Sequence, residues 1–132
     1  MIKAGIIGGS GYTGGELIRI LLNHPNATID FVFSTTRAGK KITTAHPDLL
    51  GVTDLVFTGE INKDVDVVFL CLGHGNSTSF LKENEFSKDT KIIDLSNDFR
   101  LGKAQKIGQA NTCQCRYRKY RGGGKPFGYL TF

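Results

Sequence analysis

The sequence predicts an α/β protein with a Rossmann-like parallel sheet, flanking helices and an irregular basic tail. Segments with the character of strands alternate with segments that have helical spacing, which is typical of this architecture. Residues 65–73, VDVVFLCLG, are apolar almost throughout, as expected of a strand whose two faces are both covered. A cluster of glycines, GGSGYTGG, follows the first apolar segment directly. Regular patterning stops near residue 101, so we expect the sheet to be incomplete.

The first strand and helix follow from the spacing of apolar residues. Residues 2–7, IKAGII, predict a short buried strand that ends at Gly8. The next segment predicts a helix, because its apolar residues recur on one face. These residues are Leu17, Ile18, Leu21 and Leu22. We expect Asn23 and Pro25 to end the helix, since proline cannot continue it.

The middle of the chain predicts two strands separated by a long connection. Residues 27–34, ATIDFVFS, are rich in aromatic and β-branched side chains, which favour a strand. The polar segment 35–51 predicts an irregular connection, and residues 54–58, DLVFT, predict a second, shorter strand.

The last regular elements alternate in the same way. Residues 65–73, the most apolar run, predict a strand covered on both faces. Residues 76–86 predict a helix with Asn76 or Ser77 as its N-cap, and residues 91–96 predict a further strand.

Charge divides the chain into two parts. Residues 1–101 carry a net charge of −2, whereas residues 102–132 hold no Asp or Glu and carry +7. We therefore expect a folded domain over 1–101 and a basic tail over 102–132. Three explanations of the tail stay open: out-of-frame translation of a truncated gene, a nucleic-acid-binding segment of interleaved Arg, Lys and Tyr, and a disordered solvated segment.

Composition argues against several classes of protein. No apolar run approaches the roughly 20 residues that span a bilayer. The N-terminus lacks the features of a signal peptide, so we expect a cytoplasmic protein. Cys71 lies in an apolar run and predicts a buried thiol. Cys113 and Cys115 lack the further ligands that zinc needs, so we expect neither a metal site nor a disulfide framework.

The glycines after the first strand have the spacing of a dinucleotide-binding fingerprint, G-x-G-x-x-G. Such glycines allow a tight turn, a close approach of the backbone to a pyrophosphate, and close packing of helix on strand. Backbone N–H groups at the helix start then hold the phosphates. The predicted cofactor-binding residues are Gly9, Ser10, Gly11, Tyr12, Thr13 and Gly14. The alternative is a glycine-rich turn without a ligand.

The residues after the second strand favour NADP over NAD. An NAD site usually has an acidic residue about 20 positions beyond the glycines. Ser34 stands there instead, and no acidic residue follows the strand end. Arg37 can pair with the extra phosphate of NADP, and Lys40 and Lys41 add positive potential. The alternative is a solvated basic loop.

Polar residues follow two of the predicted strands, at the sheet edge where ligands bind in open α/β folds. His74 follows the most apolar strand and either donates to a ligand or lies on the surface. Ser96 and Asn97 follow the last strand. Asp94 and Asp98 are either paired acids for proton transfer or structural residues, with Asp98 capping a turn.

Four stretches of residues 1–101 resemble the family of N-acetyl-gamma-glutamyl-phosphate reductases, which are arginine-biosynthesis enzymes of the semialdehyde-dehydrogenase group. The stretches are MIKAGIIGGSGYTGGELIRILLNHP, STTRAGKKI, DVVFLCLGHGNS and IIDLSNDFRL. The resemblance implies an NADP-binding domain over 1–101. For the whole enzyme it implies NADPH-dependent reduction of N-acetyl-glutamyl-5-phosphate to the semialdehyde. Aspartate-semialdehyde dehydrogenases share the glycine loop but resemble the other stretches less.

The resemblance also implies which residues bind the cofactor. The loop 9–14 would hold the pyrophosphate, and Ser34 and Arg37 would lie at the 2′-phosphate. The residues that would line the path to the nicotinamide are Leu72, Gly73 and Ser96.

The sequence departs from the family pattern after DFRL. The family's nucleophilic cysteine lies in an N-P-G-C-type segment that this sequence lacks, so we assign no catalytic residue. We expect the chain alone to be inactive and to meet an acyl-phosphate substrate only when completed by a second domain. We expect no membrane or nucleic-acid partner. The sequence leaves open whether the chain forms a homo-oligomer. The alternatives are a stand-alone NADP-binding module and a nucleic-acid binder that acts through its tail.

Overall fold

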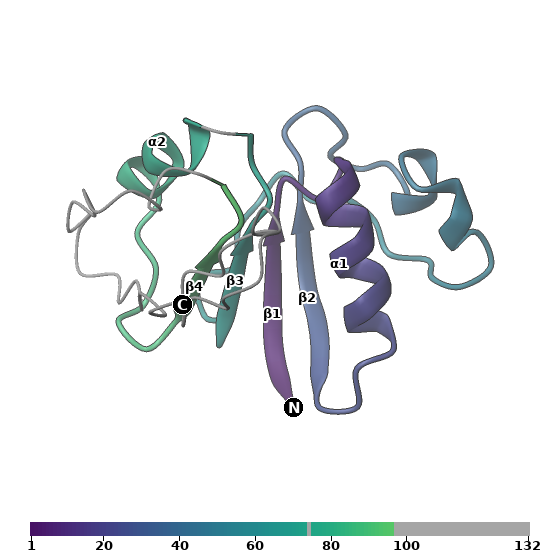
Figure 1. Cartoon of the computed structure of the whole chain (residues 1–132), viewed down its shortest axis with the longest axis horizontal. Helices are drawn as coiled ribbons and strands as arrows, with labels where there is room; N and C mark the ends of the chain where they lie inside the picture. Colours follow the sequence, from purple (N-terminus) through teal and green to yellow (C-terminus); the bar gives the residue numbers. More distant parts are fainter. Residues whose placement is uncertain (74, 97–132) are drawn as a thin grey trace, which may run out of the picture.

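The computed structural model describes residues 1–73 and 75–96, which form a four-stranded parallel sheet with a helix on each face (Figure 1). The strands are β1 (Ile2–Ile7), β2 (Ala27–Phe33), β3 (Val67–Leu70) and β4 (Lys91–Asp94). The helices are α1 (Tyr12–Leu22) and α2 (Asn76–Glu83), and two short 3-10 helices are η1 (Ile42–Thr44) and η2 (Pro47–Leu49). The predicted α/β fold with a parallel sheet is confirmed.

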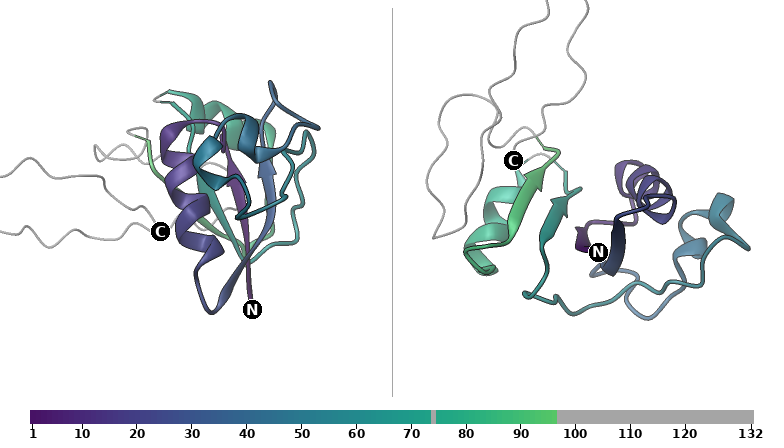
Figure 2. Two further views of the ribbon diagram at one scale, coloured as in Figure 1. Left: turned by 90° about the vertical axis from the view of Figure 1, so that its right-hand side faces the viewer. Right: turned by 90° about the horizontal axis from the view of Figure 1, so that it is seen from below.

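The order of the strands creates a switch point between β1 and β3. The sheet runs β2–β1–β3–β4, and every pair of neighbours is parallel. The chain therefore moves outward from β1 to β2, returns to the other side of β1, and moves outward again. Crossovers between parallel strands are right-handed, so the two directions of winding place α1 and α2 on opposite faces (Figure 2).

Each face of the sheet has its own hydrophobic core. Ala4 and Ile6 of β1 point to the α1 side and pack with Ile18, whereas Ile7 points to the other side and packs in the cluster of Leu81 on α2. This alternation is the ordinary period of a strand, and it explains why the strands are apolar on both faces.

Burial on both sides is complete for the second half of β1 but not for β3. Val67 and Phe69 of β3 are half-buried, so the prediction that residues 65–73 are covered on both faces is met on one face alone.

The predicted strand over 54–58 is wrong as an element. This segment forms only two isolated bridges, one parallel between Phe33 and Thr58 and one antiparallel between Lys41 and Val56. The backbone of Phe57 bonds with residues 39 and 40 of the preceding connection, not with β2. An apolar segment at the sheet edge thus divides its hydrogen bonds between two neighbours, so no continuous ladder forms.

The connection over 35–51 contributes to the core although its sequence is polar. Ile42 of η1 and Leu49 of η2 are fully buried in the cluster on the α1 side. These two short helices bring single apolar side chains inward from a segment that has no regular apolar spacing.

The later elements are shorter than the sequence predicts, and the cap of α2 differs. The N-cap is Gly75 with φ 85, and no side chain makes a capping hydrogen bond, so the predicted caps Asn76 and Ser77 are wrong. A left-handed φ favours glycine because a Cβ is disfavoured there. The hydroxyl of Ser77 is instead used by Asp94, to which it donates a 2.8 Å hydrogen bond.

Several sequence-based expectations lie outside the described residues. They concern His74, Asn97, Asp98, Cys113, Cys115 and the basic tail over 102–132. Within the residues that the structure describes, no helix is both long and apolar enough to cross a membrane.

Neighbouring isoleucines on α1 test the packing of this helix. Ile18 is 0% exposed and Ile20 is 61% exposed. We expect Ile18→Ala to lower the free energy of unfolding by about 2–4 kcal/mol, because it leaves a cavity in the core. The matched change Ile20→Ala should alter it by less than about 0.5 kcal/mol. Urea unfolding followed by circular dichroism measures both, and equal effects would contradict this packing.

Candidate functional site

The loop between β1 and α1 depends on close contacts that only glycine permits. The N–H groups of Gly8 and Gly9 both donate to the carbonyl of Phe33, at 3.1 and 3.3 Å. A Cβ on Gly9 would collide with Val32, and a Cβ on Gly14 would lie 2.6 Å from the Cα of Gly9. These contacts press the start of α1 onto the ends of β1 and β2, as the fingerprint predicts.

The opposite side of the same loop is open. A Cβ on Gly11 would meet nothing within 4 Å. The N–H groups of residues 10–14 donate to no acceptor within the described part of the chain, whereas the N–H of Gly15 bonds to the carbonyl of Gly11. Unpaired amides at a helix start are suited to bind phosphate. The loop therefore fits the pyrophosphate of a dinucleotide, with no clash from a side chain at position 11.

A cleft of about 350 Å³ continues from this loop along the switch point between β1 and β3. Three predicted residues line it: Ser10, Ser34 and Leu72. The α2 side of the cleft was not predicted from the sequence, and it contributes Asn76, Ser79, Phe80 and Glu83. Their spacing of three and four residues along a helix would place them on one face, but only the tertiary fold shows that this face borders the loop.

The basic segment after β2 divides its charges between different partners. Ser34 is 5% exposed, and its N–H donates to the carbonyl of Thr58. Arg37 donates from Nη1 to the carbonyl of Thr44 at 3.4 Å, a long bond that a phosphate can replace. Lys41 pairs with Asp54 at 3.2 Å, on the other side of the segment. Of the two, Lys41 therefore has an acidic partner, whereas Arg37 is bonded only to a backbone carbonyl in the described part of the chain.

The predicted residues near the ends of β3 and β4 have different surroundings. Ser96 is 2% exposed, and its hydroxyl donates to Asp94 at 2.8 Å. Gly73 is close to α2, since a Cβ there would lie 3.3 Å from the side-chain Nδ2 of Asn76. In the glycine loop, by contrast, the side chain of Tyr12 is 97% exposed. Ser96 is thus held in a buried network, and Tyr12 extends into solvent.

Asp94 is the centre of that network. Its carboxylate accepts hydrogen bonds from the hydroxyl groups of Ser77 and Ser96, both at 2.8 Å, and from the N–H of Ser96 at 2.9 Å. Burial, followed by the negative charge of Asp94, raises the pKa of the Cys71 thiol to about 12. Cys71 is partly buried, less than the buried thiol that its apolar segment predicts, and its raised pKa leaves it a neutral thiol at physiological pH and a poor nucleophile.

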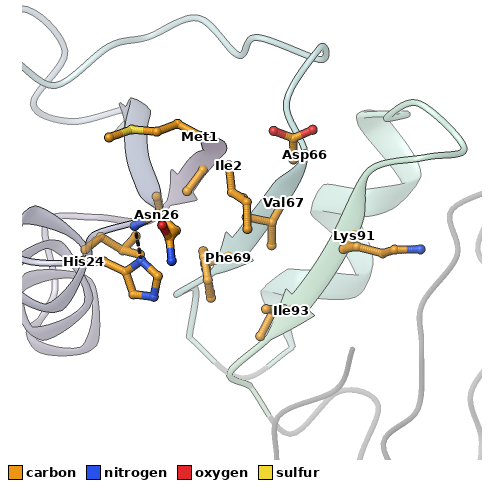
Figure 3. Close-up of a pocket in the computed structure, with 12 residues that line it drawn as sticks. Met1, Ile2, His24, Asn26, Asp66, Val67, Phe69, Lys91 and Ile93 are labelled. Carbon is orange, nitrogen blue, oxygen red and sulfur yellow. Dashed lines mark hydrogen bonds between the residues drawn. The ribbon is translucent and has the colours of Figure 1, made fainter.

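A second hollow lies at the opposite end of the sheet (Figure 3). This groove of about 770 Å³ borders the starts of β1, β3 and β4, and Val67, Phe69 and Ile93 form its apolar floor. It is larger than the cleft at the glycine loop. Ligands of open α/β sheets bind at the carboxyl ends of strands, however, and the groove has no glycine loop or helix start. We therefore do not assign it to the cofactor.

The described residues contain no cluster of three or more His, Cys, Asp or Glu side chains that would hold a metal ion.

Fold and loop together define a dinucleotide-binding α/β domain. The family model described as "Semialdehyde dehydrogenase, NAD binding domain" matches residues 3–117, and the chain belongs to this family. Members bind a nicotinamide cofactor with this domain, which agrees with the open amides of the glycine loop.

The chain is also similar to proteins named N-acetyl-gamma-glutamyl-phosphate reductase. The protein from Flavobacterium johnsoniae is 68% identical over 103 residues, which cover 78% of this chain and 32% of the relative. The protein from Christiangramia forsetii is 63% identical over 101 residues, with 76% and 32% covered. The chain therefore spans about a third of the length of these curated relatives.

A solved structure supports the fold independently. The crystal structure of aspartate semialdehyde dehydrogenase with NADP from Candida albicans aligns with a TM-score of 0.59 at 24% identity. The alignment covers 77% of this chain and 31% of that chain.

The raised pKa of Cys71 predicts a slow thiol. In a Cys113→Ser, Cys115→Ser variant, we expect alkylation of native Cys71 by iodoacetamide to stay slow at pH 9.0 and to accelerate only as pH approaches 12. The same protein unfolded in urea should titrate near the ordinary value of 9.0. The sign follows from burial, which disfavours the thiolate. Equal rates for native and unfolded protein at pH 9.0 would overturn this assignment.

Proposed function

We propose that this chain is the NADP-binding part of an N-acetyl-gamma-glutamyl-phosphate reductase. The observation that supports it most is the glycine loop, whose inner side is closed by backbone contacts and whose amides have no acceptor within the described residues. Identity of 68% to the reductase of Flavobacterium johnsoniae supports the same conclusion. In this proposal the chain binds and orients the cofactor, and the remaining two thirds of the enzyme supply the substrate chemistry.

The residues after β2 support NADP in preference to NAD. Ser34 and Arg37 stand where an NAD site has an acidic residue, and the cleft wall next to Ser34 carries Thr35 and Thr36. A hydroxyl and a guanidinium suit the 2′-phosphate, since Arg binds phosphate by charge and by paired N–H groups. The structural neighbour from Candida albicans was solved with NADP.

The residues of this chain have separate tasks in the proposed reaction. A bound nicotinamide dinucleotide supplies hydride for the reduction of an acyl phosphate to an aldehyde. The loop amides hold its pyrophosphate, and the cleft that Phe33 and Phe80 line, with their ring centroids 6.0 Å apart, gives the bound molecule an apolar wall. Cys71, the one cysteine among the described residues, is a neutral thiol and does not serve as the nucleophile. We further propose a cytoplasmic enzyme that needs no membrane or nucleic-acid partner.

Activity measurements test the division of tasks. We expect this chain to bind NADPH but to show no NADPH oxidation with N-acetyl-glutamyl-5-phosphate. Measured turnover by the chain alone would overturn this part of the proposal, and absence of NADPH binding would overturn the proposal as a whole.

Arg37→Gln tests the choice of cofactor. We expect the dissociation constant for NADPH to rise about tenfold or more, with that for NADH unchanged, because only NADPH carries the 2′-phosphate. Lys41→Gln is the matched control, since Lys41 pairs with Asp54 and should leave both constants unchanged. Titration of NADPH and NADH fluorescence measures them. Equal losses for both cofactors would show that Arg37 does not discriminate between them.

A further inference from the structure

A further close contact at the start of α1 involves Gly15, a glycine that the fingerprint does not explain. A Cβ at this position would lie 2.6 Å from both Nδ1 and Cε1 of His46. Gly15 therefore leaves room for an imidazole to pack against the first turn of α1. His46 comes from the connection between β2 and β3, 37 residues from Gly9 and far from the loop in sequence.

The same imidazole makes a hydrogen bond to the glycine loop. His46 Nε2 lies 2.6 Å from the carbonyl oxygen of Gly9, and the residue is 8% exposed. A carbonyl oxygen can only accept, so Nε2 carries the proton and donates. This bond is short and buried, and a hydrogen bond is electrostatically stronger in a protein interior than in water.

His46 is itself held firmly. Its N–H donates to the carbonyl of Ile42 at 3.0 Å, and its carbonyl accepts from Leu49 at 3.1 Å. Both partners are fully buried, with exposures of 0% and 1%. The ring of Phe57 lies beside the imidazole, with ring centroids 6.5 Å apart. The core on the α1 side therefore fixes the imidazole that contacts the loop.

The bond to Gly9 determines where the next amide points. The described peptide bonds are all trans and planar, so the carbonyl of Gly9 and the N–H of Ser10 point in opposite directions. Because the carbonyl is turned toward His46, the N–H of Ser10 is turned away from it. That N–H has no acceptor within the described residues, and Ser10 lines the cleft at the switch point.

We propose that His46 is a positioning residue for cofactor binding, which acts through the Gly9 carbonyl to direct the N–H of Ser10 toward the cofactor pyrophosphate. This inference rests on the proposed function, because it assigns a role within that same site. The alternative is that His46 only fills the core. The two roles make different demands on the side chain at position 46. A positioning role needs an N–H donor at the position of Nε2, whereas a core-filling role needs only a side chain of similar volume.

Three variants distinguish the two roles of His46. His46→Leu still fills the core but cannot donate a hydrogen bond to the Gly9 carbonyl. His46→Gln keeps an N–H donor near the position of Nε2. His24→Leu is the control, because His24 is exposed and lies beyond the other end of α1. We expect NADPH affinity to fall about tenfold in His46→Leu, to return to within about threefold of the parent in His46→Gln, and to stay unchanged in His24→Leu.

The loop itself gives a readout that requires no cofactor. We expect the backbone ¹⁵N order parameters of Ser10 and Gly11 to fall from about 0.85 to below about 0.6 in His46→Leu, and to stay high in His46→Gln. Those of β1 and β2 should not change. A uniform fall across the sheet, or no rescue by Gln, would show a core-filling role and overturn the inference.

A double-mutant cycle with Gly15→Ala tests the packing contact. In the parent, the added methyl should displace the imidazole and weaken NADPH binding about tenfold. In a His46→Ala background the space is empty, so the same methyl should have little further effect. Additive losses would overturn the inference. If the parent chain failed to bind NADPH, the proposed function would fall, whereas the order parameters would still decide whether His46 positions Ser10.

Discussion

The structure depends on a close approach of backbone segments where the strand β1 turns into the helix α1. Gly14 lies against Gly9, and Gly9 lies against Val32, so neither position has room for a side chain. This contact brings the first turn of α1 onto the carboxyl ends of β1 and β2. Unpaired N–H groups thereby collect at the switch point of the sheet, where the positive end of the helix dipole adds to their attraction for phosphate.

The other wall of the cleft has a different physical basis. A buried carboxylate costs free energy unless it is hydrogen-bonded, and Asp94 meets this requirement with three donors from Ser77 and Ser96. These bonds join the end of β4 to the start of α2. The same negative charge, together with burial, keeps Cys71 a neutral thiol. This edge of the sheet thus holds a hydrogen-bonded buried carboxylate beside a thiol that is a poor nucleophile.

Local pattern was sufficient for the first half of the fold. The strand β1 has the predicted bounds, α1 ends at Leu22 before the predicted Asn23, and β2 ends one residue before its predicted limit. Here the apolar spacing, the glycine cluster and the proline all favour the same structure. The glycine loop was also predictable, because positions without room for a Cβ must be glycine, and these glycines are visible in the sequence.

The sequence by itself thus determined the parallel α/β fold and the glycine loop between β1 and α1. Only the tertiary structure decided that residues 54–58 form bridges in place of a strand, that α2 borders the cleft, and that His46 contacts Gly9. The physical reason is the distance along the chain. Helix and strand patterns arise between residues that are near neighbours in the sequence. The burial of His46, the absence of a continuous strand over 54–58 and the position of α2 at the cleft depend on contacts between residues that only folding brings together.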